Sequence, residues 1–275
     1  MPAHSIGRTI PLILLLAALW EGAVVMADTS RHRVVTLSSL CLLDGKEYAT
    51  REYVLEETRK ACAARKNDLV VTPFLPFLTF REGQEESDLT DFRRLAKRHR
   101  TYLAVAMVEE REGGERSHTA LLFGRDGKLA GRYRKTHAIP DDDGLLLGDD
   151  LPVFATDFGT VGLSLTTDFN FPEVYWVERM KGADVLVWQT APERFRQYWE
   201  WVPLLKARAL DCHAHLVTAM YADPRTYITN RYAMGMQGAA WGRSMILNRV
   251  GTPIADTGYE DGDGGADAVE DHAAA

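Results

Sequence analysis

The segment 161–173 constrains the fold more than any other part of this sequence. Residues 161–165 alternate in the way that is typical of a buried strand, and Pro-Glu at 172–173 is typical of the first turn of a helix. Between them, Thr-Thr-Asp indicates a sharp exit from the strand. A strand that ends abruptly against a helix N-terminus is where α/β proteins place a nucleophile, because free backbone N–H groups there can stabilise an oxyanion. The residue at this turn is Thr166.

Strand-like and helix-like patterns alternate along the rest of the chain. Strands are predicted at 33–40, 69–72, 101–109, 117–123, 153–158, 161–165, 184–188, 216–221 and 245–248, and helices at 48–66, 88–99, 173–181 and 195–211. Pro73 is expected to stop the second strand and Pro203 to break the last helix. Two consecutive strands around a Gly-Gly turn predict an antiparallel section. The fold class is therefore α/β, a layered sandwich rather than an open Rossmann sheet.

Length and composition predict one large domain with a charged tail. The chain has 275 residues, of which 46% are hydrophobic, enough for a single core. Its net charge is −7, but the segment 260–275 alone holds six Asp and Glu and no Lys or Arg. We expect a folded domain at 28–259 and a disordered acidic tail at 260–275. No basic run is interleaved with aromatic residues, so a nucleic-acid partner is not expected.

The N-terminus has the pattern of an export signal. Arg8 precedes an apolar run at 10–20, and Val-Met-Ala at 25–27 offers the small or aliphatic residues that a signal peptidase reads. The run is too short for a comfortable membrane span. We therefore predict a signal peptide at 1–27 and a secreted or periplasmic protein, with an uncleaved membrane anchor as the less favoured alternative.

The cysteines and histidines do not indicate a metal site or a cofactor. Cys41, Cys62 and Cys212 are odd in number and lack zinc-like spacing. Cys62 is expected to be a buried thiol, and a disulfide between two of the three remains open. His213 and His215 flank one alanine, but no third ligand accompanies them.

Three segments occur in an order that resembles a known superfamily. They are Asp-Leu-Val-Val-Thr-Pro at 68–73, Gly-Arg-Tyr-Arg-Lys-Thr-His at 131–137, and the segment 161–173, followed by Lys-Gly-Ala-Asp at 181–184, Lys-Ala-Arg-Ala at 206–209 and Trp-Gly-Arg-Ser at 241–244. Together they resemble the carbon–nitrogen hydrolase (nitrilase and aliphatic amidase) superfamily, from about residue 34 to residue 258. The resemblance implies a four-layer αββα sandwich and a Glu–Lys–Cys triad.

Carried over to this chain, the resemblance leaves one triad residue in place. The superfamily's general base follows the proline of the first segment, where this chain has Phe74. Its lysine corresponds to Lys135, and its cysteine nucleophile corresponds to Thr166. A phenyl ring cannot accept a proton, and an alcohol needs an adjacent base to act as a nucleophile. The resemblance therefore implies a site without its base and its thiol.

Other positions of the site are also implied by the resemblance. The turn between the strand at 161–165 and the helix that starts at 172 is called the elbow below. In it, Thr167, Asp168 and Phe169 are candidate substrate-binding residues. A further carboxylate is common in the loop after the lysine, and Asp142, or either aspartate beside it, is the candidate.

Structural alternatives stand beside these roles. Lys135 could instead form an ion pair with a loop aspartate, and the hydroxyl of Thr166 could be satisfied by backbone. Phe74, with Phe77 and Phe80, is expected to fill the vacated pocket as core.

The sequence thus predicts an exported nitrilase-type protein that has lost hydrolysis and binds a small amide-like ligand or a protein partner. The alternatives are an active hydrolase of amide or nitrile C–N bonds that uses Thr166 or a recruited group, and a structural homo-oligomer. A homodimer is expected from the resemblance and from the Trp-rich segment 198–202.

Overall fold

The computed structural model describes residues 34–43, 45–139, 142, 144–191, 198–222, 244–257 and 265–271. The strands are β1 (Val34–Leu43), β2 (Leu69–Arg81), β3 (Tyr102–Glu110), β4 (Arg116–Phe123), β5 (Leu129–Arg134), β6 (Val153–Ala155), β7 (Thr160–Leu165), β8 (Val185–Gln189), β9 (His215–Ala222), β10 (Met245–Leu247), β11 (Pro253–Asp256) and β12 (Gly265–Asp271). The helices are α2 (Arg51–Ala64), α3 (Glu85–Asp88), α4 (Thr90–His99), α5 (Pro172–Met180) and α6 (Tyr198–Cys212).

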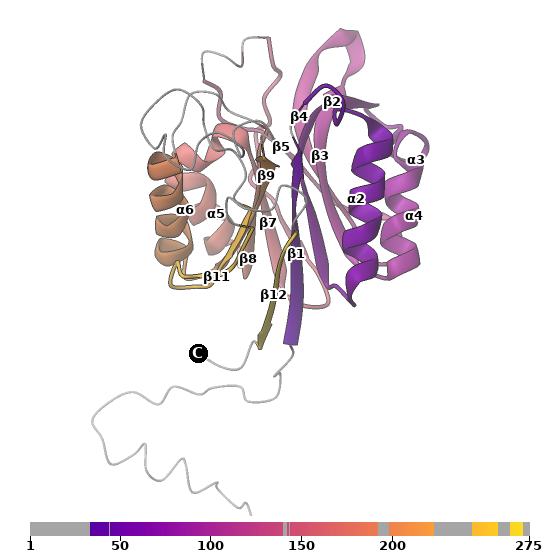
Figure 1. Cartoon of the computed structure of the whole chain (residues 1–275). Helices are drawn as coiled ribbons and strands as arrows, with labels where there is room; N and C mark the ends of the chain where they lie inside the picture. The colour runs from indigo at the N-terminus through magenta and orange to yellow at the C-terminus, as the bar shows by residue number, and fades with distance from the viewer. Residues whose placement is uncertain are drawn as a thin grey trace, which may run out of the picture. The chain divides into compact units, whose positions relative to one another are not determined.

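The strands pair in the order β5-β4-β3-β2-β1-β9-β8-β7-β6. The central pairs are parallel, from β3 through β2, β1, β9 and β8 to β7, whereas β4 and β5 on one side and β6 on the other add antiparallel pairs. Helices α2, α3 and α4 cover one side of the strands, and α5 and α6 cover the opposite side (Figure 1). This is a layered α/β sandwich with helices on both outer sides, so the predicted fold class is confirmed.

The main core lies between the two halves of the sheet. It contains branched apolar residues from both halves, among them Leu37 and Val71 from one and Leu163 and Val187 from the other. Each such side chain contributes about 1.5–3 kcal/mol by leaving water. Two further clusters lie under the helices, one beneath α2 and α4 and one beneath α5 and α6.

Two prolines do not end their elements as predicted. β2 continues through Pro73 to Arg81, because its register with β3 shifts at two places and such irregularities accommodate residues that cannot donate a ladder hydrogen bond. α6 likewise continues through Pro203. Pro203 is exposed, and because it has no N–H to donate to the preceding turn, the helix continues with one hydrogen bond fewer.

The two ends of the chain are described only in part. The predicted signal peptide lies outside the described residues. The tail that composition predicts to be disordered contains β12, which pairs with β1. Within the described part of the chain, no helix has the length and hydropathy that crossing a bilayer requires.

Candidate functional site

The sharp exit from the strand that the sequence predicts lies directly after β7, and its backbone is strained. Thr166 has a φ of 44°, in the left-handed region, which is costly for a β-branched residue. Such a conformation costs roughly 1–3 kcal/mol and persists only where the surroundings impose it. Here the indole N–H of Trp188 donates to the carbonyl of Thr166 (2.7 Å), and the N–H of Leu165 donates to Asp168 Oδ2 (2.9 Å).

The two threonine hydroxyls at the elbow are buried. Within the described residues, Oγ1 of Thr166 and Oγ1 of Thr167 have no hydrogen-bond partner. The backbone therefore does not satisfy the Thr166 hydroxyl, contrary to the structural alternative. Buried polar atoms without partners are rare in native proteins, and a bound group could pair with these two.

Asp168 connects the elbow to β5 through a hydrogen bond. Its carboxylate is fully buried, and its Oδ2 accepts a hydrogen bond of 2.7 Å from the hydroxyl of Tyr133. Burial raises the pKa of Asp168 to about 6, although the hydrogen bonds and the charge of Lys135 oppose this rise. These contacts give Asp168 a structural task at the elbow, and its contact with a substrate stays a prediction.

Lys135 is buried directly after the end of β5. Its Nζ donates to Asp142 Oδ2 at 2.5 Å, and the same oxygen accepts from the N–H of Ile139. The predicted ion pair with a loop aspartate therefore exists, and its partner is Asp142. The charge of Lys135 also lowers the pKa of Asp168, which indicates that the ammonium group lies near the elbow.

Phe74 lies in the main core, as expected, with its ring 4.5 Å from that of His118 between centroids. Phe77 and Phe80, by contrast, belong to the cluster beneath α2 and α4. Only Phe74 of the three therefore occupies the inner face, because successive side chains of a strand alternate and the bulges of β2 change which of them point inward.

His118 is a residue of the site that sequence patterns did not single out. It lies in β4, and its carbonyl accepts the backbone N–H of Lys135 (2.9 Å). Burial, together with the charge of Lys135, lowers the pKa of His118 to about 4, so its imidazole is neutral at pH 7. Its Nδ1 is buried with no hydrogen-bond partner among the described residues. A residue that only continues the alternation of its own strand has no distinctive sequence pattern. The neighbours that make His118 part of the site come from other segments, β2 and β5.

Phe169 lies away from this group. Its ring packs 5.0 Å from that of Trp188, and its carbonyl accepts hydrogen bonds from Arg208. These contacts place its side chain in the cluster beneath α5 and α6. The predicted contact of Phe169 with a substrate finds no support in this packing.

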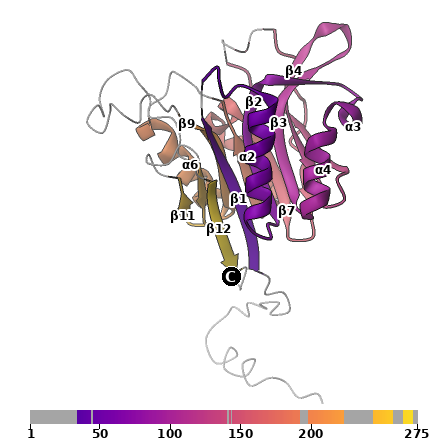
Figure 2. The ribbon, with the colours of Figure 1, turned by 45° about the vertical axis from the view of Figure 1, so that its right-hand side comes forward.

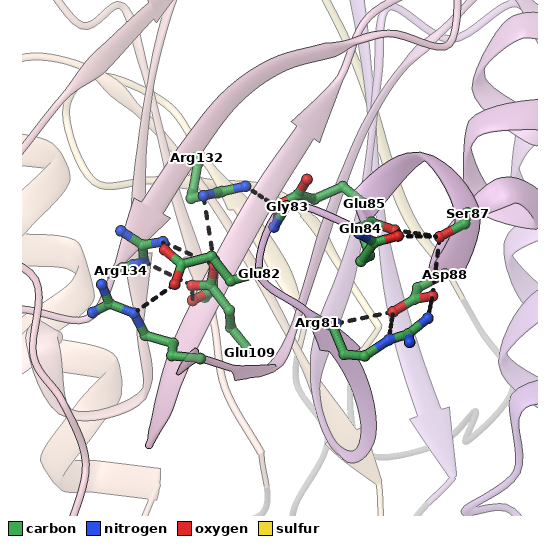
Figure 3. Close-up of polar contacts among 12 residues, drawn as sticks. Arg81, Glu82, Gly83, Gln84, Glu85, Ser87, Asp88, Glu109, Arg132 and Arg134 are labelled. Carbon is green, nitrogen blue, oxygen red and sulfur yellow. Dashed lines mark hydrogen bonds and ion pairs between the residues drawn. The ribbon is translucent and has the colours of Figure 1, made fainter. Parts of the chain in front are cut away.

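A charged cluster holds β5 from the outer side of the sheet (Figure 3). Arg134 donates to both oxygens of Glu109, at 2.7 and 2.9 Å, and also to Glu82. Thr119 donates to Glu109 as well. Because strand side chains alternate, Arg134 lies on the outer face while Lys135 and Tyr133 reach inward. The cluster therefore helps to position Lys135.

Metal and disulfide chemistry find no support in the described residues. No three His, Cys, Asp or Glu side chains of that part of the chain lie where they could hold one metal ion. Cys41, Cys62 and Cys212 are buried free thiols, so the disulfide that the sequence left open is not formed.

Comparison with known proteins identifies the family. The family model described as carbon-nitrogen hydrolase matches residues 50–263. The chain belongs to the carbon–nitrogen hydrolase family. Among curated relatives, omega-amidase NIT2 of Homo sapiens is 28% identical over 179 residues, and its Xenopus tropicalis counterpart is 30% identical over the same length. Each match covers 61% of this chain and 61% of the relative, so the chain spans about three-fifths of the relatives it matches.

Solved structures of the family share the fold. Nit3 of Saccharomyces cerevisiae superposes with a TM-score of 0.72 at 19% identity, covering 87% of this chain and 91% of that one. A mutant amidase from Nesterenkonia sp. AN1 in complex with butyramide gives a TM-score of 0.67 at 18% identity, with 87% and 91% covered. Another structure of that amidase carries an acetamide moiety on its active-site cysteine.

Proposed function

We propose that this carbon–nitrogen hydrolase family member is exported and that its site binds a small amide-like ligand without hydrolysing it. One observation carries the loss of hydrolysis: the buried ring of Phe74 lies against His118, where the resemblance requires a carboxylate base. An alcohol at Thr166 is a weak nucleophile without a base to remove its proton. Export rests on the signal-like sequence of residues 1–27.

The amide-like ligand is supported by the site and by the relatives. The unpartnered hydroxyls of Thr166 and Thr167 can each donate and accept a hydrogen bond, which suits an amide N–H and carbonyl. The relatives named omega-amidase, and the Nesterenkonia amidase in complex with butyramide, support the same ligand class.

Thermal unfolding in the presence of amides and nitriles, combined with an ammonia-release assay, tests this proposal. A ligand that binds the native state raises the unfolding temperature, so we expect stabilisation without ammonia release. Replacing Thr166 by Val fills the same space without the hydroxyl and should reduce the stabilisation. Ammonia release by the wild type that disappears in Lys135→Ala would show that the protein is a working hydrolase.

A working hydrolase is the second candidate function, and His118 is the observation that favours it. A neutral imidazole beside Phe74, with a buried and unpartnered Nδ1, could accept a proton in place of the missing carboxylate. If so, His118→Asn should abolish ammonia release while ligand-induced stabilisation persists.

We also propose that the protein forms a homodimer through α5 and α6. Trp176 and Met180 of α5 and Leu210 of α6 are 47%, 79% and 57% exposed. Apolar side chains of this size on adjacent helices suit the core of an interface. Trp201 of the Trp-rich segment is buried and packs near Trp188, so that residue is not available for an interface. A protein that dimerises but binds none of the tested compounds would have the purely structural role.

A further inference from the structure

A dense group of basic side chains lies on the outer helices, apart from the site described above. Residues 59–66, at the end of α2, contain four Lys and Arg, and residues 93–100, at the end of α4, contain five. Neither segment contains Asp or Glu. This basic face comprises Arg59, Lys60, Arg65, Lys66, Arg93, Arg94, Lys97, Arg98 and Arg100.

The two helices present these charges together. Figure 2 shows α2 and α4 side by side over the strands. Because β1, β2 and β3 are parallel, both helices return from the same end of the sheet and finish at the opposite end. Burial and the charges of Arg98 and Arg59 lower the pKa of His99, so charges from both helices act at one place.

Most of this charge faces solvent. Arg94, Lys97 and Arg98 are exposed, and among the described residues they form no ion pair. Arg59 and Lys60 are offset by Glu56 and Glu57 one turn earlier within their own helix, and the half-buried Arg93 pairs with Glu86. Arg94, Lys97 and Arg98 therefore give this face positive charge that no described carboxylate pairs with, in a chain whose net charge is −7.

Helix stability does not account for the basic face. Basic residues in the last turn interact favourably with the helix dipole, and Lys97 and Arg98 have that place. Arg94, however, lies one turn before Arg98, and like charges at this spacing destabilise a helix. A binding role is the better explanation.

We propose that the basic face docks the protein on an anionic phospholipid bilayer. Neighbouring outer surfaces of two helices suit a planar partner, and juxtaposed Lys and Arg are attracted to anionic lipid headgroups. Between the charges, the exposed residues of α2 include the small Ala63. Neither segment contains Phe, Tyr or Trp on which nucleic-acid bases could stack, which disfavours a single-stranded nucleic acid.

Docking on this face leaves the candidate site accessible. Lys135 and Thr166 follow the carboxyl ends of β5 and β7. β4 pairs antiparallel with both β3 and β5, so β3 and β5 run in the same direction. β7, β8, β9 and β1 form parallel pairs in that order, so β7 and β1 also run in the same direction. The site and the basic face therefore lie at opposite ends of the strands.

Vesicle co-sedimentation of the full chain tests the proposal. We expect binding to phosphatidylcholine vesicles that contain phosphatidylglycerol, falling as salt is raised, and much less binding to phosphatidylcholine alone. The double variant Arg94→Gln, Arg98→Gln should weaken binding about 30-fold, because each basic residue near an anionic surface is worth about a fivefold change. The control double variant Lys46→Gln, Lys206→Gln removes two exposed charges elsewhere and should bind as the wild type does.

Three results would overturn the docking proposal. The first is equal binding to both kinds of vesicle, and the second is an equal loss in the control variant with both variants folded by circular dichroism. The third is binding to single-stranded DNA, lost in Arg94→Gln, Arg98→Gln, without any binding to anionic vesicles, which would assign the basic face to nucleic acid.

Discussion

Thr166, the residue at which the resemblance implies a thiol nucleophile, has a left-handed backbone with a φ of 44°. Phe74 and Thr166 together leave Lys135 without its two expected partners. Restoring one of the two should accomplish little, because triad residues act as a unit and losing a single member costs ~10⁴–10⁶ in rate. The pair of changes is the informative experiment.

We predict that Phe74→Glu, Thr166→Cys hydrolyses simple amides, while each single variant stays near background. The thiol of Thr166→Cys alone would have no carboxylate to accept its proton, and the carboxylate of Phe74→Glu alone would be buried beside His118 without a nucleophile to serve. Phe77 needs no change, since it packs beneath α2 and α4. Ammonia release and thiol labelling of the four proteins provide the measurement, and an active single variant would contradict the expectation.

Glu178 is a buried carboxylate whose ionisation opposes folding. Neither of its oxygens has a hydrogen-bond partner among the described residues. Burial, with a contribution from the charge of Asp168, raises its pKa well above the usual 4.5. The folded state therefore binds the proton of Glu178 more tightly than the unfolded state does. The stabilisation that results is present below pH 4.5 and is lost as the pH rises toward the pKa of Glu178 in the folded state.

Glu178→Gln should therefore unfold at a higher temperature than the wild type in mildly alkaline buffer, by roughly a few degrees, and at a similar temperature near pH 4. Calorimetry across this range measures the difference. Asp168, whose pKa is raised to about 6, contributes a slope of the same sign in both proteins. A constant difference between the two proteins at every pH would exclude ionisation of Glu178 as its cause.

At the scale of elements, two ion pairs differ in environment: Arg134 of β5 pairs with Glu109 of β3, and Arg81 of β2 pairs with Asp88 of α3 (Figure 3). The Arg134–Glu109 pair includes a carboxylate that is 0% exposed, whereas the arginine of the Arg81–Asp88 pair is 64% exposed. Arg134→Met leaves the buried charge of Glu109 without its bidentate partner and should destabilise the protein by about 3 kcal/mol. Arg81→Met should change stability little. Urea unfolding of both variants checks this, and similar losses would refute the ranking.

The face shared by α5 and α6 leads to a prediction about assembly. Met180→Glu places a charge in the proposed interface and should convert a dimer into a monomer in light scattering at micromolar concentration. Leu129→Glu, at an exposed apolar position of β5, is the control and should leave the mass unchanged. A monomeric mass for the wild type would rule out the proposed interface.

At the scale of the whole molecule, export is the property that the chain's N-terminus predicts. Cleavage after Ala27 would leave a protein that starts near Asp28, before the first strand of the domain. N-terminal sequencing of exported material should find this start. Full-length protein beginning at Met1 in a soluble cytosolic fraction would count against export.

Much of the architecture could be predicted without a structure. Alternating strand and helix patterns predicted the α/β sandwich and the turn after β7, because periodicity and turn residues report directly on local backbone conformation. The choice of Lys135 came instead from the resemblance of the three motif segments to the superfamily. Even the paired loop aspartate, Asp142, was among three candidates. The length of β2 was not predictable, since the bulges that carry it past Pro73 arise from its pairing with β3.

The sequence by itself determined which residues stand at the motif positions, including Phe74 and Thr166 where the resemblance implies a base and a thiol. Only the tertiary structure decided which distant side chains meet there. His118 reaches Phe74 because β4 and β2 flank β3, and Glu178 becomes buried because α5 packs over β7 beside Gly162. Local patterns specify the conformation of a segment and which of its faces is buried. Strand pairing and layer packing bring together the side chains that share a site.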